Sequence, residues 1–544
     1  MAEKKLIRWS VVAAVVTVGL MGSGVAAAEP SGSQWDSAGG NEQNTRFQST
    51  EKKIQVGNVA NLAVKWAFTT GGDVSATPAV DGSRVYAPDW AGNLYAVDRK
   101  TGVQVWKATI SDATGVPGDK ARATPVISGN MVIVGTQGNV YSAAFGGPGG
   151  PGGNLLAYDK NTGALLWKTT LDTHAAAVIT QSATVHGNRV YVGVASLEEG
   201  VAGLVPGYVC CTFRGSMLAL DVNTGAIVWK TYTVPALPAG YTGGAVWGSS
   251  PAIDTKRGQL YIGTGNNYTI PASAQACVLA AGSDSVAVHA CIAADEHFDS
   301  ILALDLETGA IRWATAALPF DAWTVGCLGF FGPPTNCPEP AGPDFDFAQA
   351  PALFTVDLPG RGNRQDVVGA GQKSGQYWAL DPDTGAVRWM TQTGPGGTAG
   401  GLQWGSAVDG KRVYTANANS NSKPWPDAGG ATTGMWSALD ATTGQILWQT
   451  RPPHGGGTSG PATTANGVVF GCTIDSSHAA TQDDPGYMYA LNAATGAVLW
   501  EFASGGSCLS GAAISNGNVF WGSGYGNLGF GGTPNNKLYA FQLP

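Results

Sequence analysis

The sequence predicts an all-β protein folded as an eight-bladed β-propeller. One thirteen-residue unit occurs seven times along the chain, and the two chain ends carry complementary parts of an eighth copy. Charged residues make up only 12% of the chain, whereas it contains 79 glycines and 18 tryptophans. That composition is typical of many short strands joined by tight turns. Regular self-similarity of this kind indicates a repeat architecture.

The repeated unit predicts a β-hairpin. At residues 217–229 it reads MLALDVNTGAIVW, with alternating apolar residues on both sides of an Asp-x-x-Thr-Gly centre. Aspartate caps turns through its side chain and glycine provides positive φ, so the centre is a turn between two strands. The other copies lie at 94–106, 155–167, 301–313, 377–389, 436–448 and 488–500.

Further strands precede most copies, for example RVYAPD (84–89) and QLYIGT (259–264). Three or four strands in each repeat describe a propeller blade. The eighth blade is expected to join NLAVKWAF (61–68), which has only the tryptophan strand, to KLYAFQLP (537–544), which has only the first strand. Such closure leaves no long free sheet edge. The blades are then marked by Trp66, Trp106, Trp167, Trp229, Trp313, Trp389, Trp448 and Trp500, which we expect to pack between neighbouring blades.

The first residues predict a secretory signal peptide. A positively charged start is followed by an apolar run at 11–27 and by Ala26-Ala27-Ala28, a small-residue cleavage site. We expect residues 1–28 to be removed, and 29–544 to form a single propeller domain in the periplasm or outside the cell. The alternative is a retained membrane anchor, but the run is short and interrupted by glycine. We expect no other membrane span. The net charge of −8 argues against nucleic acid as a partner.

All eight cysteines lie after the signal peptide, and an even number in an exported chain suggests disulfides. Cys277 with Cys291 and Cys327 with Cys337 would close short loops, and Cys472 with Cys508 a longer one. Cys210 and Cys211 would then pair with each other, although the sequence alone does not fix this connectivity.

The A-x-D-x-x-T-G-x-x-x-W unit resembles the tryptophan-docking repeat of quinoprotein dehydrogenases, eight-bladed enzymes that use pyrroloquinoline quinone (PQQ). The resemblance covers nearly the whole chain after residue 28, and QWDSAGGNEQNTRFQ (34–48) is similar to the family's N-terminal segment. A non-enzymatic scaffold of the cell envelope is the alternative, because assembly proteins of the outer membrane use a similar repeat. Residues at the site must therefore decide between the two functions.

The resemblance implies a metal ion beside the quinone. YVGVASLEEG (191–200) is similar to the segment with the metal-binding glutamate, which it places at Glu198, with Glu199 as the fallback. YIGTGNNY (261–268) places the metal-binding asparagine at Asn266.

The family's catalytic aspartate follows a P-H-D-x-W segment, which LPFDAW (318–323) resembles, but here Thr324 comes next. We interpret 324–343 as an inserted loop stapled by Cys327 and Cys337. Asp344 then becomes the catalytic base and a metal ligand, with Asp321 as the alternative base. Asp346 becomes a further ligand, which in the family accompanies lanthanide rather than calcium use.

The resemblance also implies residues that bind PQQ. These are Thr180 at a carboxylate, Trp247 flat against the ring, Lys373 at the quinone oxygens, Glu198, and the pair Cys210 and Cys211, with Arg214 in the place of an arginine that follows the pair. The CCTFRG segment resembles polyvinyl alcohol dehydrogenases. In methanol-type enzymes the adjacent cysteines come one blade earlier, before the glutamate, so contact between this pair and PQQ is an open question.

The implied chemistry fits these residue types. Carboxylate and amide oxygens suit a hard cation such as Ca²⁺ or a lanthanide, and a carboxylate can accept a hydroxyl proton. We therefore expect a PQQ-dependent dehydrogenase for secondary alcohols, with polyvinyl alcohol or a similar hydroxylated polymer as substrate. A sugar-oxidising quinoprotein is a further alternative. No Cys-x-x-Cys-His occurs, so electrons should pass to a separate acceptor such as a cytochrome c.

Overall fold

A computed structural model describes Met1 and residues 34–330, 335–358, 364–474, 486–526 and 532–544. The predicted signal peptide at 1–28 lies outside the described residues, apart from Met1. The propeller is built from eight antiparallel sheets, each with four strands in line, and one of them carries an additional short strand. The predicted all-β, eight-bladed fold is therefore confirmed.

The first four complete blades run in chain order. They comprise β2 (Ala79–Val80), β3 (Arg84–Pro88), β4 (Asn93–Asp98) and β5 (Gln104–Thr109); β6 (Val126–Ser128), β7 (Met131–Gly135), β8 (Asn154–Asp159) and β9 (Leu165–Thr170); β10 (Ala177–Val178), β11 (Thr184–His186), β12 (Arg189–Ser196), β13 (Ser216–Asp221) and β14 (Ile227–Tyr232); and β16 (Ala252–Asp254), β17 (Gln259–Gly263), β19 (Ser300–Asp305) and β20 (Ile311–Ala316).

The remaining blades complete the ring. They comprise β21 (Ala352–Asp357), β22 (Arg364–Gly371), β23 (Gln376–Leu380) and β24 (Val387–Gln392); β25 (Ala407–Val408), β26 (Arg412–Asn417), β27 (Met435–Asp440) and β28 (Ile446–Thr450); β29 (Thr463–Ala465), β30 (Val468–Cys472), β31 (Tyr487–Asn492) and β32 (Val498–Ala503); and β33 (Ala513–Ser515), β34 (Asn518–Ser523), β35 (Lys537–Gln542) and β1 (Ala63–Thr69).

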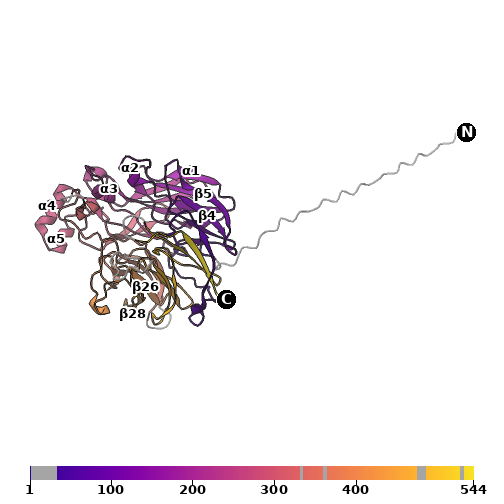
Figure 1. Cartoon of the computed structure of the whole chain (residues 1–544). Coiled ribbons are helices and arrows are strands. Elements are labelled where there is room, and N and C mark those ends of the chain that lie inside the picture. The colour runs from indigo at the N-terminus through magenta and orange to yellow at the C-terminus, as the bar shows by residue number, and fades with distance from the viewer. Residues whose placement is uncertain (2–33, 331–334, 359–363, 475–485, 527–531) are drawn as a thin grey trace. The chain divides into compact units, whose positions relative to one another are not determined.

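The last of these blades closes the ring. Its outermost strand β1 pairs with β35, with Trp66 opposite Ala540, so the two ends of the chain share one sheet. Figure 1 shows the yellow C-terminal strands beside the indigo N-terminal ones. The closure predicted from the two incomplete repeats is therefore present.

The turn that recurs in each repeat has the structure that its aspartate and glycine predict. In the blade of β13 and β14, Asp221 Oδ1 accepts hydrogen bonds from the backbone N–H groups of Asn223 and Thr224 and from Thr224 Oγ1, at 3.0–3.1 Å. Gly225 follows with φ of 71°, a backbone conformation in which glycine has no Cβ to clash. These bonds fix the hairpin turn locally, which explains why one short motif specifies seven blades.

The tryptophan at the end of each repeat joins its blade to the next. Trp229 Nε1 donates to Leu306 O at 3.1 Å, and a Cβ at Gly309 would lie 2.5 Å from the Trp229 ring. The turn glycine of one repeat thus packs against the tryptophan of the repeat before it. The same ring-to-glycine contact occurs at Trp66, Trp106, Trp167, Trp313, Trp389 and Trp448.

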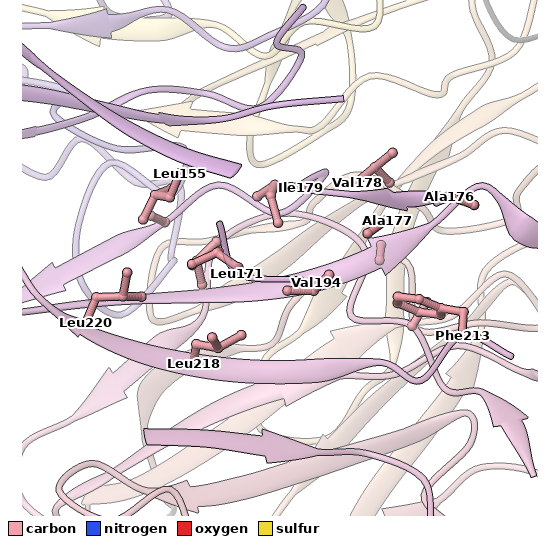
Figure 2. Close-up of a cluster of buried hydrophobic side chains, with 14 of the residues drawn as sticks. Leu155, Leu171, Ala176, Ala177, Val178, Ile179, Val194, Phe213, Leu218 and Leu220 are labelled. Atoms are coloured by element: carbon pink, nitrogen blue, oxygen red, sulfur yellow. The ribbon is translucent and has the colours of Figure 1, made fainter. Parts of the chain in front are cut away.

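The apolar core lies between blades as well as within them. The cluster drawn in Figure 2 contains Leu155 of β8 together with Ile179, Val194, Leu218 and Phe213, which belong to the following blade or its loops. Each blade therefore buries its faces against its neighbours. The rigid ring that results positions the loops at its ends.

Few helices interrupt the strands. They are α1 (Ile110–Thr114), α2 (Val140–Ala144), α3 (Glu198–Leu204), α4 (Ala272–Ala281) and α5 (Ser285–His289), with short 3₁₀ turns η1 (Val59–Asn61), η2 (Leu237–Ala239), η3 (Val325–Leu328) and η4 (Pro426–Ala428). A two-stranded ribbon pairs β15 (Thr242–Gly243) with β18 (Asn267–Thr269). Within the part of the chain that is described, none of these helices has the length and apolar character of a membrane span.

The cysteines form the four predicted pairs, namely Cys210–Cys211, Cys277–Cys291, Cys327–Cys337 and Cys472–Cys508. The peptide bond between Cys210 and Cys211 is cis. The Cys327–Cys337 bridge closes the predicted inserted loop, and Asn336 Nδ2 ties that loop to the carbonyls of Ala202 and Tyr208 at 3.0 and 2.8 Å.

Candidate active site

The second strands of three consecutive blades bring the site residues together. Glu198 and Glu199 follow β12, Asn266 follows β17 and Lys373 follows β22. Equivalent strands of a propeller run in the same direction, so their carboxyl ends meet at one end of the ring. Side chains distant in the sequence therefore converge there.

A buried lysine lies between two buried aspartates. Lys373 Nζ is 2.9 Å from Asp344 Oδ1 and 2.7 Å from Asp346 Oδ2, and all three residues are at most 6% exposed. Burial lowers the pKa of Lys373, but the two carboxylates outweigh it and hold this pKa well above its usual value. Burial raises the pKa of Asp344 well above 3.8, with Lys373 opposing the shift.

Asn266 presents an oxygen that has no partner. Its backbone N–H donates to Asp346 Oδ1 at 2.8 Å, and its Nδ2 donates to the carbonyls of Asn267 and Trp323 at 2.9 and 2.8 Å. Because Nδ2 is occupied, the orientation of the amide is fixed. Oδ1 is buried without a hydrogen-bond donor in the described structure, so it is an oxygen that a ligand could use.

Glu198 holds the loop that carries the cysteine pair. Its carboxylate accepts the N–H groups of Thr212 and Phe213 at 2.8–3.1 Å and the hydroxyl of Tyr208 at 2.7 Å, and His174 Nε2 lies 3.5 Å away. Burial raises the pKa of Glu198, but His174 and these hydrogen bonds together lower it below its usual value. The carboxylate is thus fully engaged with this loop.

Glu199 instead belongs to the charged centre. Burial raises its pKa to about 8; the Lys373 cation opposes this shift, and repulsion from Asp346 and Asp321 adds to it. Its Oε2 is buried and has no hydrogen-bond partner among the described residues. Because Glu198 is committed to the cysteine loop and Glu199 interacts electrostatically with Lys373 and Asp346, the fallback, Glu199, is the carboxylate favoured to face the site.

Asp321 lies directly behind Asp344. Its Oδ1 accepts the N–H of Asp344 at 3.2 Å and its Oδ2 accepts the N–H of Phe345 at 2.8 Å. A second buried carboxyl, Asp299, lies against Asp321, and burial followed by repulsion from Asp321 raises the pKa of Asp299 well above its usual value. No sequence motif points to Asp299, because it stands just before β19, an ordinary blade strand.

The Trp247 ring borders the same centre. A Cβ at Gly265 would lie 2.7 Å from Asp346 Oδ1 and 2.8 Å from Trp247 Nε1, so glycine allows these two groups to approach each other. Trp247, Cys210 and Cys211 all pack on the apolar cluster of Figure 2.

A positively charged pocket adjoins the centre. Its lining includes Arg46, Arg122, Thr180, Ser182 and Trp404 but no acidic residue. The Arg122 guanidinium lies 4.6 Å from the Trp404 ring, and Gly248, the neighbour of Trp247, approaches the same ring. An anionic group would therefore be stabilised here.

Arg214 points elsewhere. Its guanidinium covers the Tyr232 ring at 3.9 Å and donates to Val234 O at 2.7 Å. The structure thus brings Thr180 together with Arg122, an arginine that sequence reasoning missed, and it leaves Arg214 outside the pocket. Arg122 directly precedes the Ala-Thr-Pro segment at 123–125, which leads into β6, the first strand of its blade. This position just before a first strand was the sequence signal that could have identified it.

The types of donor at the centre suit a hard cation. Glu199, Asp344 and Asp346 supply three carboxylates against one lysine, and Asn266 supplies a free amide oxygen. Oxygen ligands with excess negative charge suit Ca²⁺ or a lanthanide ion. In the described residues, no three His, Cys, Asp or Glu side chains are arranged to hold a metal by themselves. Lys373 occupies the space between the two aspartates.

Comparison with known proteins identifies the family. The family model described as "Outer membrane protein assembly factor BamB" matches residues 52–315 and 432–542. A polyvinyl alcohol dehydrogenase from Sphingopyxis sp. (strain 113P3) is 30% identical, over 94% of this chain and 76% of its own length. The chain belongs to the quinoprotein alcohol dehydrogenase family. The predicted family and enzyme class are thereby confirmed.

Solved structures of other quinoproteins share the fold. The quinohemoprotein alcohol dehydrogenase ADHIIG from Pseudomonas putida HK5 superposes with a TM-score of 0.69 at 18% identity, over 94% of this chain and 80% of that one. A europium-containing methanol dehydrogenase gives a TM-score of 0.67 at 18% identity, over 94% and 99% of the two chains. At these identities the likeness shows the propeller alone.

Proposed function

We propose that this quinoprotein is an exported, PQQ-dependent dehydrogenase that oxidises secondary alcohols, with polyvinyl alcohol or a similar hydroxylated polymer as its substrate. The buried arrangement of Asp344, Lys373 and Asp346 beside the free oxygen of Asn266 carries the proposal. A propeller has no structural need for such a cluster, because isolated buried charges are unfavourable unless a ligand or partner compensates them.

We assign the metal site to Glu199, Asn266, Asp344 and Asp346. Glu199 replaces the predicted Glu198 in this proposal, because the Glu198 carboxylate is committed to the cysteine loop. The ion would be Ca²⁺ or a lanthanide. The presence of Asp346 adds one negative charge to the set, which favours the trivalent ion.

We assign the PQQ site to the pocket beside this centre. Thr180 and Arg122 would bind its carboxylates, Arg122 taking the role predicted for Arg214. Trp247 would stack on its ring, and Lys373 would contact the quinone oxygens. The Cys210–Cys211 pair would form the opposite face, supported by Glu198. PQQ, when bound, supplies the acceptor for the hydride that leaves the alcohol carbon.

The protein's own part in the reaction is to orient the alcohol and to move its proton. Asp344 would accept the hydroxyl proton as general base, and Lys373 would stabilise the ionised form of Asp344 from 2.9 Å. Burial of both groups excludes water from the reacting atoms. Electrons would pass to a separate acceptor such as a cytochrome c.

The scaffold alternative is less well supported. The name of the matching family model belongs to an assembly factor, but the repeat that it covers is shared by enzymes and scaffolds alike. A scaffold function would leave the buried cluster and the positive pocket without a purpose.

The test is reconstitution. Purified protein supplied with PQQ and either Ca²⁺ or La³⁺ should bind PQQ and reduce an artificial dye with polyvinyl alcohol or 2-butanol. Asp344→Asn should lose the activity while still binding PQQ. Asp254→Asn, a change at a buried aspartate outside the site, is the matched control and should retain it. Absence of both PQQ binding and dye reduction with either metal would contradict the proposal.

A further inference from the structure

Asp321 joins two parts of the site that an insertion separates in the sequence. The segment Asp321–Trp323 pairs with the chain at Asn267: Asn267 N donates to Asp321 O at 3.2 Å, and Trp323 N donates to Asn267 O at 2.8 Å. Twenty residues then intervene before Asp344. The Asp321 side chain bonds to the chain on the far side of that insertion, because its two oxygens accept the N–H groups of Asp344 and Phe345.

The contact is tight and fully enclosed. Asp321 is 0% exposed. A Cβ at Gly342 would lie 2.0 Å from Asp321 Oδ1, so only glycine permits the chain to approach this carboxylate so closely. Asp344 itself has φ of 59°, a left-handed conformation that non-glycine residues seldom adopt and that the surroundings must impose. The two backbone N–H groups that donate to Asp321 lie at this turn and at the residue after it.

We propose that Asp321 is a positioning residue that holds the catalytic Asp344 in register with Asn266 across the inserted loop. Each of its oxygens accepts a backbone donor of the segment that carries Asp344, so we assign it to holding that segment and leave the role of base to Asp344. The proposal rests on the function proposed above for Asp344. Its structural part, that Asp321 orders the segment 342–347, can be measured without PQQ, metal or substrate.

Asp321→Asn is the decisive variant. The amide keeps one acceptor oxygen and places an NH₂ group against a backbone N–H, so one of the two bonds is lost at nearly constant volume. Asp254→Asn is the matched control. Asp254 is also buried, at 2% exposed, and it too accepts a backbone N–H, from Arg257 at 3.1 Å. It pairs with Gln259, at the end of β17 remote from Asn266.

The experiment has two readouts. In the metal-free protein, hydrogen exchange followed by mass spectrometry should be at least about tenfold faster for peptides covering 342–347 in Asp321→Asn, and unchanged in Asp254→Asn. In the reconstituted enzyme, the kcat of Asp321→Asn should fall about 10- to 100-fold, as when groups that orient a ligand are lost. The alcohol KM and the PQQ affinity should stay within about threefold of the wild type, because no group that touches either is changed.

Three results would overturn the proposal: wild-type exchange at 342–347 in Asp321→Asn, an equal loss of kcat in both variants, or a loss confined to PQQ affinity. If the wild type has no activity but exchange accelerates only in Asp321→Asn, the proposed function fails while the ordering of 342–347 by Asp321 stands.

Discussion

Glu198 and Glu199 are adjacent in the chain, yet their carboxylates serve different parts of the site. Glu198 accepts the backbone N–H groups of Thr212 and Phe213 beside the cysteine pair. Glu199 faces the charged centre of Lys373 and Asp346. The two side chains point in different directions because both lie in the first turn of α3, where successive residues point about 100° apart.

This division predicts opposite effects of two matched substitutions. Glu199→Gln should weaken binding of Tb³⁺ to the metal-free protein by at least about tenfold, because it removes an anionic ligand. Glu198→Gln should leave Tb³⁺ affinity within about threefold, while the loop at 205–215 becomes more sensitive to proteolysis. Terbium luminescence titration and limited trypsin or chymotrypsin digestion measure the two effects. The reverse pattern would return the ligand role to Glu198.

The raised pKa of Glu199 predicts a pH dependence of stability in the metal-free protein. Burial raises this pKa to about 8 in the folded state, against about 4.3 in an unfolded chain. Between these values the folded protein retains a proton that the unfolded chain releases. Stability contributed by this group is therefore present at pH 4 and is lost as the pH rises towards 8.

Thermal unfolding in EDTA at pH 5, 6.5 and 8 checks this expectation. The Tm difference between the wild type and Glu199→Gln should change progressively across that range, in the direction of a less stable wild type at high pH. Glu198→Gln is the control, and its Tm should change with pH in the same way as the Tm of the wild type. A constant difference between the wild type and Glu199→Gln would show that Glu199 ionises normally.

The sequence was sufficient for the fold because the determinants of each blade are local. The turn at Asp221 and Gly225 and the contact of Trp229 with Gly309 lie within one repeat or between consecutive ones. The ring follows once such contacts are repeated and closed. The four disulfides were likewise within reach, since each pairs cysteines that are close in the chain.

The directions of the side chains at the site could not be predicted from the sequence. The choice between Glu198 and Glu199 depends on where α3 begins relative to β12, which a motif cannot specify. Arg122 lies one blade before Thr180 in the sequence, and the two residues come together only where their blades line one pocket. Asp321 was interpretable only as an alternative base, because its bond to Asp344 spans an insertion. These assignments depend on three-dimensional register.

Asp346 should decide between lanthanide and calcium. Its Oδ1 accepts the N–H of Asn266 and its Oδ2 lies 2.7 Å from Lys373. Asp346→Asn keeps the volume and an acceptor for Asn266 but removes the charge. We expect activation by La³⁺ to weaken at least about tenfold, and activation by Ca²⁺ to change less, since a trivalent ion depends more on the anionic ligand count. Dye-linked activity titrated with each ion measures this, and equal losses for both ions would argue against a charge-based selectivity.

Packing between blades should depend on the turn glycine that lies against the tryptophan ring of the preceding repeat. Gly309 has φ of 71° and lies against the Trp229 ring, whereas Gly258 has φ of 64° with no atom near the position of a Cβ. Gly258→Ala should therefore incur only the strain of the left-handed backbone, about 1–2 kcal/mol. Gly309→Ala adds an overlap with the ring, worth about 1–3 kcal/mol more. Urea denaturation followed by tryptophan fluorescence should give a lower midpoint for Gly309→Ala than for Gly258→Ala. Equal midpoints would mean that the Trp229 ring moves away freely, and that the tryptophan contact contributes little to the closure of the ring.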